Sequence, residues 1–355
     1  MATYDLIADL PVAIDGYELE RLSAQLGPTF TRVTTVIRLR GAGQDGIGED
    51  VIYESDDQDA QLAAGPVLPI TGSFTLASLA ARLEEVDLFP TPPAREPSRD
   101  YRRWAYESAA LDLALRQSET TLHAVLGREP RPVNFVASTR LTGEPPTVEG
   151  VRKRRAIAPN LRFKLDPEND WTPELIDELA ALDCVDTFDL KGFYKGTVVE
   201  VQTDPELYRR CAEAVPGAFL EDPDLSVPEA AAALEPHRDR ITWDAPLHSV
   251  ADIEALPFPP QTINSKPSRF GPLERLFAVY DHCAERGIGI YGGGQGELGC
   301  GRGQLQYLAS LFHPDTPNDI APSQYNLPDP PAGLPAPPLE PAPSATGFRW
   351  EANTT

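Results

Sequence analysis

The chain has 355 residues, of which 41% are hydrophobic and 24% are charged, so it can bury one large core or two smaller ones. Its 54 acidic residues outnumber the 31 lysines and arginines and give a formal net charge of -23. That charge opposes association with nucleic-acid phosphates and anionic lipid headgroups, so we expect neither a nucleic-acid partner nor a membrane partner.

The cysteines and the N-terminus indicate the compartment. The four cysteines have no CxxC spacing, which indicates reduced thiols and neither a zinc cluster nor a disulfide framework. The chain lacks the run of about 20 apolar residues that a membrane helix needs. Its start, "MATYDLIADLPVAIDG", is acidic where a signal peptide is basic. We therefore expect a cytoplasmic protein; its oligomeric state stays open, with a homo-oligomer among the alternatives.

Residues 1–98 are predicted to form an α+β capping domain. Segment 31–55 alternates around a glycine-rich turn, which is typical of two strands, and "TLASLAARLEEV" at 75–86 has a helical pattern. "FPTPPAREPS" at 89–98 holds four prolines without periodicity and is interpreted as the linker to the next domain.

Residues 99–325 are predicted to form a barrel domain. After a helix over 101–117, which carries Trp104, Leu111 and Leu115 on one face, short apolar runs alternate with helical segments. Parallel strands need such long connections, so the pattern predicts an α/β fold with a closed (β/α) barrel; an open doubly wound sheet is the alternative. The predicted strands cover 133–137, 161–166, 185–190, 217–222, 240–245, 261–266 and 287–293.

Helix-start residues support these connections. Thr172 and Asp204 each precede a proline, and Ser226 stands three residues before Glu229 in a capping-box spacing. The five histidines do not end strands at the right spacing and are expected at the surface or at helix ends. Residues 326–355 are proline-rich and are predicted to form a strap, whose "TGFRWE" returns to the cap as an edge strand.

Five charged residues follow the same register as the strands. Lys164, Asp189, Glu221, Asp244 and Lys266 each end a successive predicted strand. In a barrel such positions meet at the face that carries active sites. Three carboxylates gathered there would repel one another without a cation, and an oxygen-only ligand set favours Mg²⁺.

The motifs "RFK", "FDLKG", "FLEDP", "TWDAP" and "INSKPSRFG" resemble the enolase superfamily, in particular the branch of muconate lactonizing enzymes, o-succinylbenzoate synthases and dipeptide epimerases. The resemblance implies a modified TIM barrel, (β/α)7β, with an N-terminal α+β capping domain and a returning tail. It implies Asp189, Glu221 and Asp244 as the Mg²⁺ ligands. It also implies Lys164 and Lys266 as the acid/base pair, without saying which is base.

The resemblance further implies a reaction. The proton α to the carboxylate of a small-molecule substrate would be removed through an ene-diolate intermediate. Racemisation or epimerisation, cycloisomerisation, or syn-dehydration would follow, as in enzymes of the mandelate racemase and muconate cycloisomerase type. The protein would thus be an isomerase or lyase. In the family, specificity lies in cap loops, here expected near 23–29 and 41–54.

Four further residues are assigned to substrate binding or electrostatic support. Arg162 replaces the first lysine of the family's K-x-K and is a candidate for the charge that lowers the pKa of Lys164. Lys191 replaces the asparagine of "DxN" and adds a cation near the metal. Gln295 and Glu297, in the glycine-rich segment 291–303, are candidates for substrate contacts.

Other interpretations stay open. Taken singly, each carboxylate could cap a helix, and the lysines could form structural ion pairs. A Schiff-base enzyme of the aldolase type would use Lys164 or Lys266 as nucleophile and would not need three carboxylates. A non-catalytic metal-binding homologue is the third function, and Arg162 and Lys191 motivate it.

Overall fold

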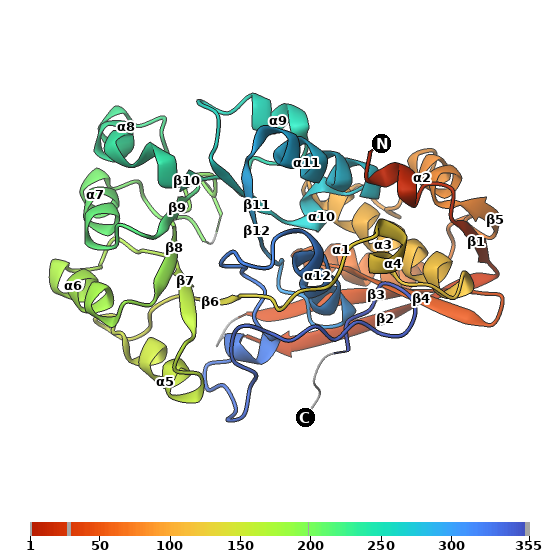
Figure 1. The fold of residues 1–355 in the computed structure, drawn as a ribbon, viewed down its shortest axis with the longest axis horizontal. Helices are drawn as coiled ribbons and strands as arrows, with labels where there is room; N and C mark the ends of the chain where they lie inside the picture. Colours follow the sequence, from red (N-terminus) through yellow and green to blue (C-terminus); the bar gives the residue numbers. More distant parts are fainter. Residues whose placement is uncertain (1, 27–29, 198, 352–355) are drawn as a thin grey trace.

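The computed structural model describes residues 2–26, 30–197 and 199–351. Its N-terminal half contains a three-stranded antiparallel sheet and a separate antiparallel pair (Figure 1). The sheet is made of β2 (Gly16–Gln25), β3 (Thr31–Gly41) and β4 (Gln44–Asp50), and the pair of β1 (Pro11–Ile14) and β5 (Gly72–Thr75). The two strands predicted around the glycine-rich turn are thereby confirmed as β3 and β4.

The two segments that were expected to be specificity loops are partly strands. Half of segment 41–54, residues 44–50, is strand β4 and not a loop. In segment 23–29, residues 23–25 end β2, and residues 27–29 lie outside the described residues.

Helices accompany the sheet in this half of the chain. They are η1 (Tyr4–Leu6), α1 (Ser55–Ala64), α2 (Leu76–Glu84), α3 (Ser98–Gln117) and α4 (Leu122–Leu126). Of these, α1 and α3 contact the sheet. The long helix α3 lies directly on β4, because a Cβ at Gly46 or Gly48 would come within 2.2 Å of a helix carbonyl. Although α3 begins at the predicted domain boundary, its main contacts are therefore with the N-terminal sheet.

Seven parallel strands form most of the barrel, and each overlaps one predicted run. They are β6 (Val136–Thr139), β7 (Arg162–Leu165), β8 (Val185–Asp189), β9 (Phe219–Glu221), β10 (Ile241–Thr242), β11 (Thr262–Ser265) and β12 (Gly289–Gly292). Five pair in the order β10-β9-β8-β7-β6, and β11 pairs with β12.

Three backbone hydrogen bonds close the ring. The amide of Asn264 on β11 donates to Trp243 after β10 (3.0 Å). The amide of Asp319 donates to Gly292 of β12 (2.7 Å), and that of Val136 in β6 donates to Asn318 (2.8 Å). Residues 318–319 thus take the place of an eighth strand.

Helices connect the strands. They are α5 (Glu149–Ile157), α6 (Pro173–Leu182), α7 (Pro205–Ala214), α8 (Pro228–Leu234), η2 (Glu235–Arg240), α9 (Val250–Glu254), α10 (Pro267–Phe270), α11 (Leu273–Arg286), α12 (Cys300–Phe312) and η3 (Ser323–Asn326). Thr172 and Asp204 cap α6 and α7 as predicted. The predicted capping box at Ser226 is wrong, because Val227 is the N-cap of α8 and the Ser226 hydroxyl donates to Asp224 (2.5 Å). No described helix is both long and apolar enough to cross a membrane.

The C-terminal segment runs back to the N-terminal half (Figure 1). The amide of Phe348 donates to Asp112 of α3 (2.8 Å), and the guanidinium of Arg349 pairs with the same carboxylate (2.7 Å). Among the described residues, 346–351 make only isolated bridges, so the predicted edge strand is wrong. His313 is the C-cap of α12, in line with the expectation of a position at the surface or at a helix end, and it is buried, with 6% of its surface exposed.

Candidate active site

Five predicted side chains meet where the barrel strands end. Asp189 and Glu221 are the last residues of β8 and β9, Lys164 lies in β7, and Lys266 directly follows β11. Asp244 follows β10 by two residues. All five are buried, with 0 to 7% of their surface exposed. A parallel ring brings the carboxyl ends of its strands to one rim, so distant sequence positions become neighbours.

Lys164 is held by carboxylates. Its Nζ pairs with Glu221, lies 3.2 Å from the Oδ2 of Asp189 and 3.7 Å from the Oδ2 of Asp319. Burial alone would lower the pKa of Lys164, but these negative charges outweigh it and hold the pKa well above its usual value. Lys164 is therefore an ammonium in this arrangement.

Lys266 shares Asp244 with an arginine. Its Nζ lies 2.7 Å from the Oδ2 of Asp244, and the Nε of Arg269 lies 3.1 Å from the Oδ1. Arg269 also donates to the Tyr194 hydroxyl (3.0 Å). Burial would raise the pKa of Asp244, but Arg269 and Lys266 bring it down to about 2. Asp244 is therefore ionised.

Glu221 and Asp222 are crowded by negative charge. One oxygen each of Asp189, Glu221 and Asp222 lie within 4.8 Å of one another. Burial, together with the neighbouring carboxylates, raises the pKa of Glu221 to about 8 and that of Asp222 to about 7. Both shifts show that the ionised forms of Glu221 and Asp222 are disfavoured, first by burial and then by the neighbouring carboxylates.

Asp222 was not predicted as a site residue, and its contacts indicate that it supports the backbone next to Asp244. Its two oxygens accept hydrogen bonds from the amides of Asp244 (2.8 Å) and Ala245 (2.9 Å), so it fixes the backbone at the end of β10. In contrast, the two oxygens of Asp244 are ion-paired with Arg269 (3.1 Å) and Lys266 (2.7 Å), and no backbone amide of the described residues donates to either. The only sequence signal for Asp222 is its place next to Glu221.

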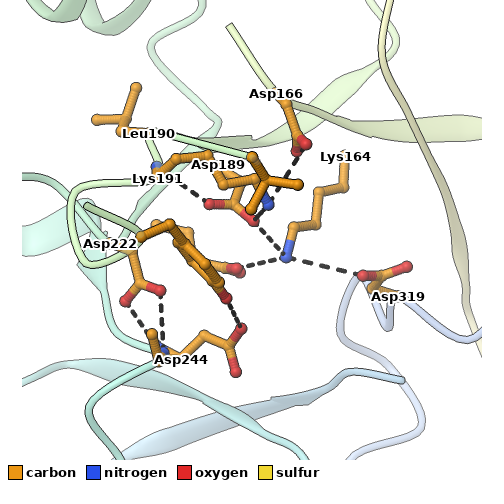
Figure 2. A network of polar contacts seen from close by, with 12 residues as sticks. Lys164, Asp166, Asp189, Leu190, Lys191, Asp222, Asp244 and Asp319 are labelled. Carbon is orange, nitrogen blue, oxygen red and sulfur yellow. Dashed lines mark hydrogen bonds and ion pairs between the residues drawn. The ribbon is translucent and has the colours of Figure 1, made fainter. Parts of the chain in front are cut away.

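Carboxylates outnumber cations in this network, part of which Figure 2 shows. Six carboxylates lie with four cations, and Asp166 is also paired with Arg140 (3.2 Å). The carboxylates are Asp166, Asp189, Glu221, Asp222, Asp244 and Asp319, and the cations are Lys164, Lys191, Lys266 and Arg269. The carboxylates offer oxygen-only donors, which suit a hard ion such as Mg²⁺.

Lys191 lies inside this network, as its sequence position suggested. Its Nζ is 2.5 Å from the Oδ2 of Asp189 and 3.3 Å from the Oδ2 of Asp166. Asp319, which the sequence did not single out, points its carboxylate at Lys164 from the opposite side (Figure 2). Burial raises the pKa of Asp319, and the surrounding cations oppose that rise.

Arg162 is not brought into the site. Its Nε lies 2.6 Å from the Oδ1 of Asp186, and its Nη1 donates to the carbonyl of Asp183 (2.9 Å). It begins β7, two residues before Lys164, so it faces the opposite end of the barrel. We therefore do not assign it an effect on Lys164.

Gln295 and Glu297 are buried beside the N-terminal half and make contacts outside the lysine and carboxylate cluster. The side-chain amide of Gln295 donates to the Tyr101 hydroxyl of α3 (3.1 Å). Glu297 pairs with Arg302 (3.0 Å) and accepts from the amide of Gln295 (2.6 Å). Neither side chain forms a hydrogen bond or ion pair with the five converging residues, so their contacts indicate a role in holding the loop after β12.

Two residues of the N-terminal sheet grip the same loop, and we call them the cap clasp. Arg32 donates to the carbonyls of Gln295 (2.8 Å) and Gly296 (3.1 Å). Glu49 accepts from three amides at the start of α12, those of Leu298 (2.7 Å), Gly299 (3.0 Å) and Gly301 (2.8 Å). Both side chains are fully buried. No local sequence pattern marks such contacts between distant segments.

Several solved structures are similar to this chain over most of its length. A member of the enolase superfamily from Enterococcus faecalis V583 is 17% identical, with a TM-score of 0.66 over 87% of this chain and 86% of that chain. A dipeptide epimerase from the same organism is 15% identical, with a TM-score of 0.66 over 95% of this chain and 99% of that chain. A protein of the mandelate racemase/muconate lactonizing enzyme type from Roseovarius nubinhibens ISM, complexed with magnesium, is 16% identical, with a TM-score of 0.65 over 96% and 97%.

These likenesses show the fold: an N-terminal cap on a modified (β/α)7β barrel, as the sequence predicted. No curated protein matches the chain. Two family models do, and they meet between residues 125 and 129, beyond the predicted boundary at 98. The N-terminal model matches residues 5–125 and the C-terminal model residues 129–327. The chain thus has the enolase-superfamily fold and belongs to the family described as domain of unknown function DUF8230, of which it carries both the N-terminal and the C-terminal domain.

Proposed function

We propose that the protein is an Mg²⁺-dependent isomerase or lyase that removes the proton α to the carboxylate of a small-molecule substrate. The observation that carries this proposal is the joint placement of two lysines and a carboxylate cluster. Lys164 and Lys266 come from β7 and β11, the second and sixth members of the ring, which lie across the barrel from each other. Two amines on opposite sides can reach both faces of a planar intermediate.

Asp189, Glu221 and Asp244 are the proposed holders of the cation. They are buried, and they offer only oxygen ligands. When bound, the cation supplies positive charge that stabilises the second negative charge developing on the substrate carboxylate. Asp222 keeps the backbone of Asp244 in place through its two amide contacts.

The lysines carry out the proton transfers. A neutral lysine takes the α-proton, and the electron pair of the broken C–H bond forms the ene-diolate. Return of a proton from the other lysine to the opposite face gives epimerisation, while departure of a β-substituent gives a lyase product. Lys164 must therefore lose its present ion pairs with Glu221 and Asp189 before it can act as a base.

The proposal is tested by isotope exchange in deuterated water. The full-length protein and Mg²⁺ are incubated with a panel of carboxylates, including dipeptides, N-acylamino acids and 2-hydroxy acids. Mass spectrometry then detects incorporation of one deuterium at the α-carbon. We expect exchange with at least one class, lost on chelation and in the variant that carries both Lys164→Met and Lys266→Met, but kept in Lys153→Met. Lys153 is the matched control because its ammonium pairs with Asp329 at the surface.

Two outcomes would contradict the proposal. Exchange that persists in the double lysine variant would remove the proposed acid/base pair. Substrate trapped covalently on Lys164 or Lys266 by borohydride would instead identify a Schiff-base enzyme.

A further inference from the structure

Lys191 folds back on the strand end that it follows. Its φ of 56 lies in the left-handed region, which side chains other than glycine rarely adopt. In this conformation its amide donates to the Oδ1 of Asp189 (3.3 Å) and its ammonium lies 2.5 Å from the Oδ2. One residue thus contacts both oxygens of a proposed metal ligand.

A second carboxylate holds the same ammonium. The Oδ2 of Asp166 lies 3.3 Å from the Nζ of Lys191 (Figure 2). The Nε of Arg140 lies 3.2 Å from the same Asp166 oxygen. Asp166 follows β7 and Asp189 ends β8, so Lys191 bridges two neighbouring strand ends. The ammonium therefore has a partner that it can keep when Asp189 is taken by another cation.

We propose that Lys191 competes with the divalent cation for Asp189 and so limits the metal affinity of the site. The inference rests on the proposed function, because it concerns the same metal ligand. Two positive charges on one carboxylate oxygen repel each other, and a divalent ion must displace the ammonium toward Asp166 before it can bind. Lys164, at 3.2 Å from the same oxygen, adds to this competition but is proposed to be needed for the reaction.

The test is a calorimetric titration of the full chain with Mg²⁺ alone. Lys191→Met removes the competing charge and is expected to bind Mg²⁺ at least about tenfold more tightly than the unchanged protein. Lys195→Met is the matched control. Lys195 lies four residues further on, is 61% exposed, and pairs with Asp224 at 2.7 Å, so its loss should change the affinity less than about twofold.

A double-mutant cycle checks the part played by Asp166. Asp166→Asn leaves Lys191 with Asp189 alone, so the variant should bind Mg²⁺ more weakly than the unchanged protein. The same change should have a smaller effect when Lys191 is already methionine, because the competitor is gone. Thermal unfolding of each variant shows that the titrations are made on folded protein.

The outcomes separate the two proposals. Binding by the unchanged protein with equal or weaker binding by Lys191→Met overturns the inference and leaves the proposed metal site standing. No binding by either protein contradicts the metal-dependent function itself, and the inference falls with it. Tighter binding by Lys191→Met together with a cycle that couples the two positions supports the inference.

Discussion

The ammonium of Lys266 lies 2.7 Å from the Oδ2 of Asp244, which ties the end of β11 to the residue that follows β10. Both side chains are buried, so the removal of one partner leaves a buried charge without its match. The cost of that loss depends on the remaining neighbours. Asp244 keeps Arg269 when Lys266 is lost, whereas Lys266 and Arg269 both lose their partner when Asp244 is lost.

This asymmetry predicts unequal destabilisation. Lys266→Met should lower the free energy of unfolding by less than about 3 kcal/mol, and Asp244→Leu by more than about 3 kcal/mol. Urea denaturation of the three proteins under identical conditions measures the difference. Equal losses would mean that Arg269 does not compensate for Lys266.

Asp244 and Asp222 are predicted to differ in metal binding. Asp244→Asn removes a proposed ligand and should weaken Mg²⁺ affinity by more than about 100-fold, whereas loss of a supporting residue costs about tenfold. Asp222→Asn should weaken Mg²⁺ affinity by only about tenfold, because Asp222 already accepts two backbone hydrogen bonds and acts as a supporting residue. Calorimetry without substrate measures both; a larger loss in Asp222→Asn would reverse the assignment.

The two lysines are predicted to act on opposite faces of the substrate. With a substrate found by the exchange screen, Lys164→Met should stop deuterium exchange for one configuration at the α-carbon and Lys266→Met for the other. The reason is that β7 and β11 lie across the ring. Exchange of each configuration is followed separately by proton NMR. Loss of the same configuration in both variants would show that the lysines do not face each other across the substrate.

The convergence of Lys164, Glu221 and Lys266 could be predicted from spacing, because parallel strands in a ring have only one carboxyl rim. Asp319 could not be predicted in this way. Its strand position is two residues long, too short for any periodic signal, and only its hydrogen bond to Gly292 reveals it. Arg162 shows the limit of the same reasoning: it shares a strand with Lys164 but pairs with Asp186 at the other end.

His313 predicts a pH dependence of stability. Burial lowers its pKa from 6.5 to about 4, and its Nδ1 lies 2.7 Å from the Oδ1 of Asn318, beside the residues that close the barrel. Below pH 6.5 His313 is protonated in the unfolded chain but stays neutral in the folded protein. The free energy of unfolding therefore falls as the pH drops toward 4. The loss should reach about 3 kcal/mol.

Urea denaturation at several pH values between about 7.5 and about 4.5 measures how the free energy of unfolding changes as His313 titrates. His313→Asn removes the titrating group, so its stability should depend less on pH over the same interval. Parallel curves for the variant and the unchanged protein would exclude His313 as the cause.

The cap clasp predicts a strong effect of a residue far from the reacting atoms. Arg32→Met leaves the carbonyls of Gln295 and Gly296 without donors and should lower the free energy of unfolding by about 3 kcal/mol. Arg21→Met is the control, because Arg21 is 43% exposed and pairs with an exposed aspartate, so its loss should cost less than about 1 kcal/mol. Equal losses in urea denaturation would show that Arg32 is dispensable.

The same clasp affects how this protein could be recombined with its relatives. Arg32 and Glu49 lie in the N-terminal sheet, but all of their partners between residues 295 and 301 belong to the barrel half. A chimera that receives a foreign cap would lose Arg32 and Glu49. The loop at residues 295–301 would then lose the hydrogen bonds that these two buried side chains make with it. Grafts should therefore exchange that loop together with the sheet, as one transferable module.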